Sequence, residues 1–531
     1  MKKFTLTSFL LFNFLIGSFA QHRYVDPIFS GTQITSNITY GQNISVLLGG
    51  MQDLKMDVYE PVGDTLAQRP LIVYMHPGDF LPIVCNGGVN GDLHDSAVVE
   101  MCKQFARRGY VVANIDYRLG WLPLNPNQDC RKGSLYQAVY RGLQDAKTCV
   151  RYFKMNAAVQ GNSYKIDTGK IVVGGQGSAG YISTAYAALN QPSELLLPQF
   201  ISSSTDASCG STTGQPFIVE SVLGDFDGFG GLPQYNNPNW PGYSSKVEMV
   251  FNMEGGMGDT SWMQQGEVPM VSFHDVNNPL APYDLGNVFV PLGDGTILLV
   301  TEVAGSHLFI KRANELGNNN IFHIGWTDPY TTRANRVDDG YTVNGFSREG
   351  LFPIVQPDPS LFIPGDPYHG QTSPWEWWNC ADLEKAAPFC GQTPGFADTV
   401  CGAGFYTNPN MSKTKALNYI DTVQYYLDER ICLALGLCSG NVIGINEASV
   451  FKAEVNLFPN PASQVIHLNL NNTSLHFLAV RIYDIEGRKV YSEENLYRNS
   501  LDINCDQFRK GSFIIHTQTE KGNAAGKLVI D

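Results

Sequence analysis

The sequence lacks the cysteine spacing of a structural zinc site. Its eleven cysteines include no Cys-x-x-Cys pair and no Cys–His combination at metal-binding spacing, so we expect neither a metal nor an organic cofactor. An odd number of cysteines leaves at least one thiol free or paired between chains. Five cysteines cluster late in the chain, where we expect disulfides although the pairing stays open: Cys380, Cys390, Cys401, Cys432 and Cys438.

A long apolar run is missing after the N-terminus. No window of about 18 uninterrupted apolar residues follows residue 20, so no transmembrane helix is expected. Residues 1–20 combine Lys2 and Lys3, an apolar stretch and a small-x-small ending at Ala20, which is typical of a secretory signal peptide. A membrane anchor is the alternative, although the apolar core is short for one. We therefore expect a soluble, exported protein in which disulfides can form.

Basic residues are in the minority. Lys and Arg number 36 against 50 Asp and Glu, and the formal net charge of −14 excludes non-specific binding to nucleic acid. Hydrophobic residues make up 43% of the chain and charged residues 16%, which excludes a mostly disordered protein. Internal repeats and low-complexity tracts are also missing.

Three blocks follow the signal peptide. Residues 21–438 alternate strand-like and helix-like patterns, residues 439–447 form a short linker, and residues 448–531 are strand-like. The alternation predicts an α/β fold with a mostly parallel sheet and helices on both faces. Insertions break the rhythm near 190–245 and 325–410. The expected strands are 37–44, 54–59, 70–75, 110–116, 171–174, 247–253, 268–273 and 321–324, and the expected helices are 96–108, 135–158, 179–189, 305–316 and 413–435.

A glycine-rich turn carries the main candidate for chemistry. Residues 174–180 read GGQGSAG between a buried strand and a helix. A serine on such a turn projects its hydroxyl from the sheet edge, and the N–H groups of the following helix can hold an oxyanion. Ser178 is therefore the candidate nucleophile. The alternative is an ordinary glycine-rich turn or a phosphate site.

The segments around this turn resemble the α/β-hydrolase fold, in particular its carboxylesterase and feruloyl-esterase-like members. The resemblance runs from about residue 50 to 190. It rests on His76–Phe80 (HPGDF), Arg107–Val112 (RRGYVV), Asp116–Gly120 (DYRLG), Gln144–Asp145 with Arg151–Phe153, and Lys165–Asp167. It implies a serine hydrolase that cleaves carboxylic esters, of a small molecule or a polysaccharide, through an acyl-enzyme. It also implies an oxyanion hole from the Gly78 loop and the N–H of Ala179.

Several positions depart from the family pattern. Gln176 stands where the usual motif has its first glycine, Pro77 lacks an N–H, and Asp79 would oppose an oxyanion. Residues 269–283 resemble the family's acid loop, but the acid position holds Asn278, which leaves Asp275 or Glu254 as the acid. These departures support an alternative function: a catalytically degenerate protein that binds a ligand or partner. A peptidase on the same fold is a third reading.

The general base should lie beyond the last core strand. His369 has the better loop position, with His323 behind it, while His307 falls within a helix pattern. The predicted triad is therefore Ser178, His369 and Asp275. The aromatic run at 375–378 lines a pocket or packs the insertion.

The last block resembles the type IX secretion C-terminal sorting domain of Bacteroidetes. It holds FPNPAS at 458–463, YDIEGRKV at 483–490 and GKLVI at 526–530 in the family's order. The resemblance implies passage across the outer membrane by the type IX machinery, then release or surface attachment. An immunoglobulin-like binding module is the alternative.

Overall fold

The computed structural model describes residues 22–83, 86–206, 209, 212–292, 296–324, 328–340, 348–355, 370–381, 396–438, 455–472, 475–484, 489–519 and 522–530. These residues form two compact units. The larger comprises those up to Ile324 and those of Arg333–Cys438, and the smaller comprises those of Ser439–Asp531 with those of Gly325–Thr332. None of the described helices is long and apolar enough to span a membrane.

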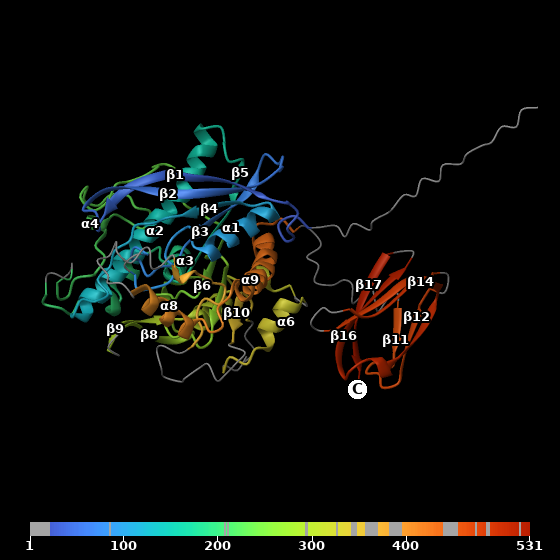
Figure 1. Cartoon of the computed structure of the whole chain (residues 1–531). Coiled ribbons are helices and arrows are strands. Elements are labelled where there is room, and N and C mark those ends of the chain that lie inside the picture. Colours follow the sequence, from blue (N-terminus) through green and yellow to red (C-terminus); the bar gives the residue numbers. More distant parts are fainter. Residues whose placement is uncertain are drawn as a thin grey trace, which may run out of the picture. The chain divides into compact units, whose positions relative to one another are not determined.

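An eight-stranded sheet forms the centre of the larger unit, in the order β1-β2-β4-β3-β5-β6-β7-β10 (Figure 1). The strands are β1 (Thr32–Ser45), β2 (Gly50–Pro61), β3 (Arg69–Met75), β4 (Val111–Ile115), β5 (Ile166–Gln176), β6 (Met249–Met253), β7 (Met270–Asp275) and β10 (Leu351–Ile354). β2 pairs antiparallel with β1 and β4, and the remaining pairs are parallel. The predicted α/β class is confirmed.

The order of the strands fixes where a site can form. The chain passes from β3 through α1 (Ser96–Arg108) to β4 on one side, and from β4 through α2 (Gln128–Val159) to β5 on the other. Because such crossovers are right-handed, α1 and α2 cover opposite faces. A crevice therefore opens beyond the carboxyl ends of β3 and β5, where α/β sheets bind ligands. α3 (Ser178–Ala188) packs against α2, and α9 (Lys413–Ala434) packs against α1.

Two predicted features of the sheet need correction. Residues 321–324 are not a strand: Asn320–Phe322 forms a short 3-10 helix in which Phe322 alone is buried. The last strand is instead β10, which lies inside the stretch expected to be an insertion and is buried throughout. β10 is an edge strand, where its proline costs no ladder hydrogen bond. A hairpin of β8 (Leu285–Pro291) and β9 (Ile297–Ala304) was not expected.

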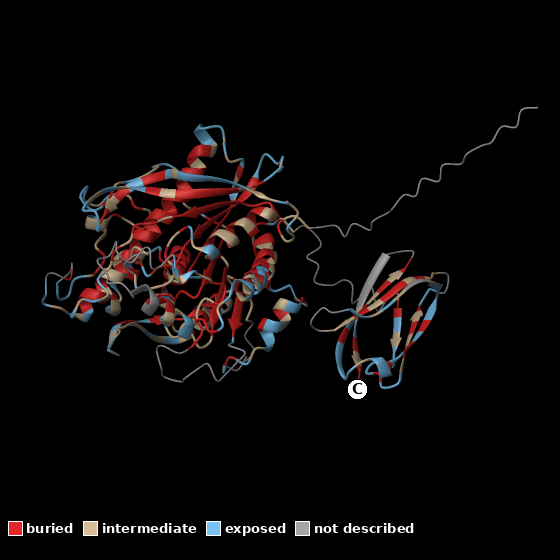
Figure 2. Ribbon diagram, in the orientation of Figure 1, coloured by how far each residue is buried: buried red, intermediate tan, exposed pale blue. Residues whose placement is uncertain are grey.

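Apolar residues of the sheet and of the helix faces against it form one core (Figure 2). β3, β4 and β6 are buried along their whole length, as parallel strands covered on both faces should be. Short helices complete the unit: α4 (Glu220–Leu223), α5 (Ser306–Glu315) and α8 (Phe396–Thr407). The division between the two units falls within α6 (Pro329–Arg336). Disulfides join Cys130 to Cys209, Cys380 to Cys401 and Cys432 to Cys438.

The smaller unit consists of two antiparallel sheets that share one apolar core. Buried residues alternate with partly buried ones along β12 and with exposed ones along β15, which is the pattern of strands with one covered face. One sheet has the order β11-β12-β15 and the other β14-β13-β16-β17. The strands are β11 (Val455–Phe458), β12 (Val465–Leu470), β13 (Phe477–Asp484), β14 (Lys489–Arg498), β15 (Ser500–Asn504), β16 (Gly511–Thr519) and β17 (Gly522–Ile530).

Candidate active site

A sharp turn joins β5 to α3 at the crevice. Gly177 occupies the strained position of this turn, with φ 56° and ψ −121°, and its N–H donates to the carbonyl of Met253 at 2.8 Å. Residues with a side chain rarely adopt this conformation, so glycine suits the position. Ser178 follows as the first residue of α3, and its side chain is 5% exposed.

The sequence motif predicts that position 176 packs tightly in the turn, but the structure has this close packing one residue earlier, at Gly175. A Cβ on Gly175 would lie 2.7 Å from the Cβ of Ala179, so these two residues form the close contact that brackets the turn. Gln176 is therefore not at the tightly packed position, and its amide has room. Its Nε2 donates to Glu376 Oε1 at 2.7 Å, and its Oε1 accepts from the hydroxyl of Tyr74 at 3.2 Å.

Tyr117 holds the Ser178 side chain. The two hydroxyl oxygens are 3.2 Å apart, and Tyr117 also donates to the backbone carbonyl of His76 at 2.9 Å. Since the phenol has one proton, the serine hydroxyl donates to Tyr117 in this arrangement. No histidine within the described ranges hydrogen-bonds Ser178. Tyr117 was not singled out from the sequence, although it belongs to the DYRLG segment.

The segment after β3 forms the predicted oxyanion loop. Gly78 has φ +127°, and a Cβ there would lie 2.4 Å from the Cα of Gly91. Asp79 and Phe80 also have positive φ values, 56° and 55°. Consecutive strained residues persist only when the surroundings enforce them, and they gather at functional sites. Asp79 is exposed yet has many protein atoms around it, and the resulting desolvation raises its pKa to about 6.

His76 is buried directly after β3. Its Nδ1 lies 2.6 Å from the carbonyl oxygen of Pro77 and its Nε2 lies 3.3 Å from Asp116 Oδ1, so both nitrogens face acceptors. Burial opposes protonation, but the hydrogen bond and charge of Asp116 outweigh it and raise the pKa of His76. Its ring stacks on Tyr117 with the centroids 4.8 Å apart.

Two buried carboxyls meet where the triad acid was expected. Asp275 ends β7 and accepts from Gln371 Nε2 at 2.5 Å, while Glu254 follows β6 and accepts from Thr372 and Ser373. Desolvation raises the pKa of Asp275 well above its usual range, and the neighbouring Glu254 raises it further. The charge of Glu254 and the buried position of Asp275 therefore both oppose ionisation of Asp275.

The side-chain amide of Asn278 hydrogen-bonds within its own loop and to Thr372. Its Oδ1 accepts from the N–H groups of Leu280 and Ala281 at 2.8 and 2.9 Å, and its Nδ2 donates to Thr372 Oγ1 at 3.1 Å. The amide thus caps a turn and contacts the segment that also binds Glu254. Asn278 acts as a structural residue of the loop.

The candidate histidines lie in different parts of the chain, and none of those described hydrogen-bonds Ser178. His369, the predicted base, lies outside the described residues, and Gln371–Ser373 just after it contact the two carboxyls. His323 is exposed and 3.2 Å from Asn314 Oδ1, and His307 lies 3.1 Å from Asp284 Oδ1. His274 is fully buried, and desolvation lowers its pKa, so it is neutral.

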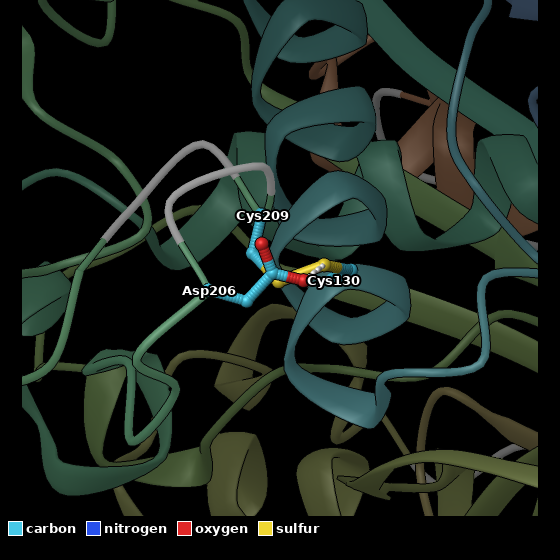
Figure 3. Close-up of side chains that lie close together, drawn as sticks. All are labelled: Cys130, Asp206 and Cys209. Carbon is cyan, nitrogen blue, oxygen red and sulfur yellow. Dashed lines mark hydrogen bonds between the residues drawn. A yellow bond between two sulfur atoms is a disulfide. The ribbon is translucent and has the colours of Figure 1, made fainter.

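One group in the described part of the chain has the composition of a metal site. Cys130, Asp206 and Cys209 lie together, as Figure 3 shows. The two sulfurs form a disulfide and so offer no thiolate ligand. The cluster therefore ties the 190–245 segment to α2.

Two segments of the chain match known protein families. Residues 56–226 match the BD-FAE family. The matched residues lie in the larger unit and correspond to an esterase-like α/β-hydrolase domain. Residues 456–531 match the "Secretion system C-terminal sorting domain", so the chain is exported by type IX secretion to the cell surface or the outside. Together the matches support, in general terms, a secreted ester hydrolase.

Over about half of its length the chain is similar to solved structures of an esterase. Thermogutta terrifontis esterase 2 phosphorylated by paraoxon is 18% identical, with a TM-score of 0.27 over 48% of this chain and 74% of that one. Its propionate-bound form is 17% identical, with a TM-score of 0.28 over 48% and 75%. None of the curated proteins matches the chain.

Proposed function

We propose that the chain is a secreted carboxylic ester hydrolase with Ser178 as its nucleophile. The observation that carries the proposal is the position of Ser178 at the N-terminus of α3, with its oxygen 3.2 Å from the hydroxyl of Tyr117, which also binds the carbonyl of His76 at the start of the loop after β3. The serine oxygen bonds to the acyl carbon, its proton passes to the base, and the carbonyl electron pair moves onto oxygen. Collapse then expels the alcohol, which takes the proton, and water releases the acid in the reverse sequence.

His369 is the proposed base, with Asp275 and Glu254 as its charge partner. Support comes from chain order, because His369 follows β10, the last strand of the sheet, and precedes the segment bound to both carboxyls. The N–H of Ala179 and the Gly78 loop are the proposed backbone donors to the oxyanion.

An apolar cavity of about 40 Å³ lies beside α3 and favours a small acyl group. Tyr181, one turn after Ser178, forms one wall, and Tyr136, Phe200 and Trp262 contribute others. A short aliphatic acyl chain fits such a space better than a large polar one. Acetyl and propionyl esters are therefore the substrates to test first.

One observation favours a second function, binding of an ester-bearing ligand or partner without turnover. The strained elbow position, where such hydrolases carry their nucleophile, is occupied by Gly177. The serine one residue later donates to Tyr117 instead of a histidine. In this second function the site keeps the shape of an esterase and lacks its covalent chemistry.

Turnover of p-nitrophenyl acetate separates the two functions. Under the first, Ser178→Ala abolishes turnover while circular dichroism and the melting temperature stay unchanged. Under the second, the wild-type protein has no turnover above the Ser178→Ala background, and Gly177→Ser gains it. Because a Cβ at Gly177 would lie 3.0 Å from Pro77 Cβ, Gly177→Ser is also made together with Pro77→Gly, which relieves that contact.

A further inference from the structure

The oxyanion loop of this chain is short of a backbone donor. Proline has no N–H, so Pro77 cannot donate to a developing oxyanion. Asp79, two residues later, adds negative charge above its pKa of about 6. A hydrolase with this loop needs a compensating donor, because each oxyanion donor is worth about 10²–10³ in rate.

We propose that the hydroxyl of Tyr117 is a catalytic donor of the oxyanion hole. This inference rests on the proposed function of Ser178 as the nucleophile. The phenolic oxygen is 3.2 Å from Ser178 Oγ, and it already donates to the carbonyl of His76 at the start of the loop. In the tetrahedral intermediate the oxyanion and Ser178 Oγ are attached to the same carbon atom. The oxyanion therefore lies within hydrogen-bond reach of the Tyr117 hydroxyl.

The position of Tyr117 is rigid enough for this role. Its side chain is fully buried, and its ring stacks on His76 and packs edge-on against Phe80 at a centroid distance of 6.1 Å. The next residue, Arg118, binds Asp145 through its backbone N–H and its guanidinium, at 2.8 and 2.9 Å. Because the ring is held in place, only the phenolic hydrogen has to reorient during the reaction.

Tyr117 keeps its proton throughout the step. When the serine proton leaves for the base, Tyr117 Oη loses the hydrogen bond that it accepted from Ser178. The phenolic hydrogen then rotates from the His76 carbonyl to the oxyanion, and it returns when the tetrahedral intermediate collapses. No bond to Tyr117 is made or broken.

Tyr117→Phe tests this role because it removes the hydroxyl and keeps both ring contacts. We expect kcat/KM for p-nitrophenyl acetate to fall about 10²–10³-fold. A trifluoromethyl ketone adds to Ser178 and carries an oxyanion, so its affinity should fall by the same factor. The affinity for the corresponding unreactive secondary alcohol should change less than about threefold, since it carries no oxyanion.

Two variants run in parallel. Tyr110→Phe removes another buried phenol, one that donates to the carbonyl of Tyr24 at 2.9 Å and takes no part in the proposed site, and it should keep kcat/KM within about threefold. Ser178→Ala tests the proposed function itself. If Ser178→Ala is inactive while Tyr117→Phe keeps its kcat/KM, the inference on Tyr117 is overturned and the nucleophile stands.

Two other results would overturn the inference on Tyr117. An equal loss of affinity for the ketone and the alcohol in Tyr117→Phe would show a purely structural role and overturn the inference. If the wild-type protein has no turnover, no oxyanion forms on it, and both proposals are overturned.

Discussion

The carboxyl pair of Glu254 and Asp275 allows a quantitative test of the proposed triad. Both side chains are buried, and each has one oxygen without a hydrogen-bond partner, Glu254 Oε1 and Asp275 Oδ2. If the pair carries one negative charge, removing either carboxyl leaves the other to ionise, because the repulsion that held its proton is gone. We therefore expect Glu254→Gln and Asp275→Asn to lose less than about tenfold in kcat/KM each.

The double variant should behave differently. Without any carboxylate the imidazolium loses its charge partner, and an amide in place of the acid costs about 10⁴-fold in serine hydrolases. A loss of 10⁴ corresponds to about 5.5 kcal/mol, and two tenfold losses sum to about 2.7 kcal/mol. The predicted coupling energy between the two substitutions is therefore about 3 kcal/mol.

The assay is the initial rate of p-nitrophenyl acetate hydrolysis by the four proteins, with melting temperatures to confirm folding. Asp284→Asn is the control, since Asp284 is an ordinary carboxylate beside His307. A collapse in one single variant alone would refute proton sharing and identify that residue as the acid. Additive, small losses would refute any role of the pair as charge partner.

Three further predictions follow from the described contacts. Asp79→Asn should raise kcat/KM above pH 6, where Asp79 is ionised and repels the oxyanion, and leave it unchanged below pH 5; a pH–rate profile with a loss at pH 8 would contradict this. Asn278→Asp should change kcat/KM by less than about threefold, because its oxygen already caps a turn; a gain near 10² would show that the acid is missing. Asp145→Asn should lower the free energy of unfolding by about 3–5 kcal/mol in urea denaturation, because it leaves the buried Arg118 guanidinium unpaired, and a loss below about 1 kcal/mol would refute this.

The sheet was predictable because buried parallel strands are continuous apolar runs. Pro70–Met75 and residues 247–253 show this pattern clearly, and the structure has β3 and β6 there. The run at 321–324 has the same composition, but only Phe322 reaches the core. β10 is four residues long and contains proline, so composition alone does not distinguish it from a loop.

The site was predictable in part. The glycine-rich turn indicated its place, but four of its seven residues are glycines, and the sequence leaves open which one takes the strained conformation. That choice depends on the contact between Gly175 and Ala179, which is a property of packing. Glu254 and Asp275 lie close together because the adjacent parallel strands β6 and β7 end near each other. The spacing of these two residues in the sequence does not predict this proximity. The role of Tyr117 depends on burial beside Ser178.

Labelling with a fluorophosphonate probe tests the central proposal most directly. The probe phosphonylates an activated serine, and peptide mapping by mass spectrometry identifies the residue. The account predicts one adduct, on Ser178, that is absent from Ser178→Ala and reduced in the double variant Glu254→Gln/Asp275→Asn. An unlabelled wild-type protein, with labelling gained at position 177 in Gly177→Ser, would contradict the account and establish the binding function in its place.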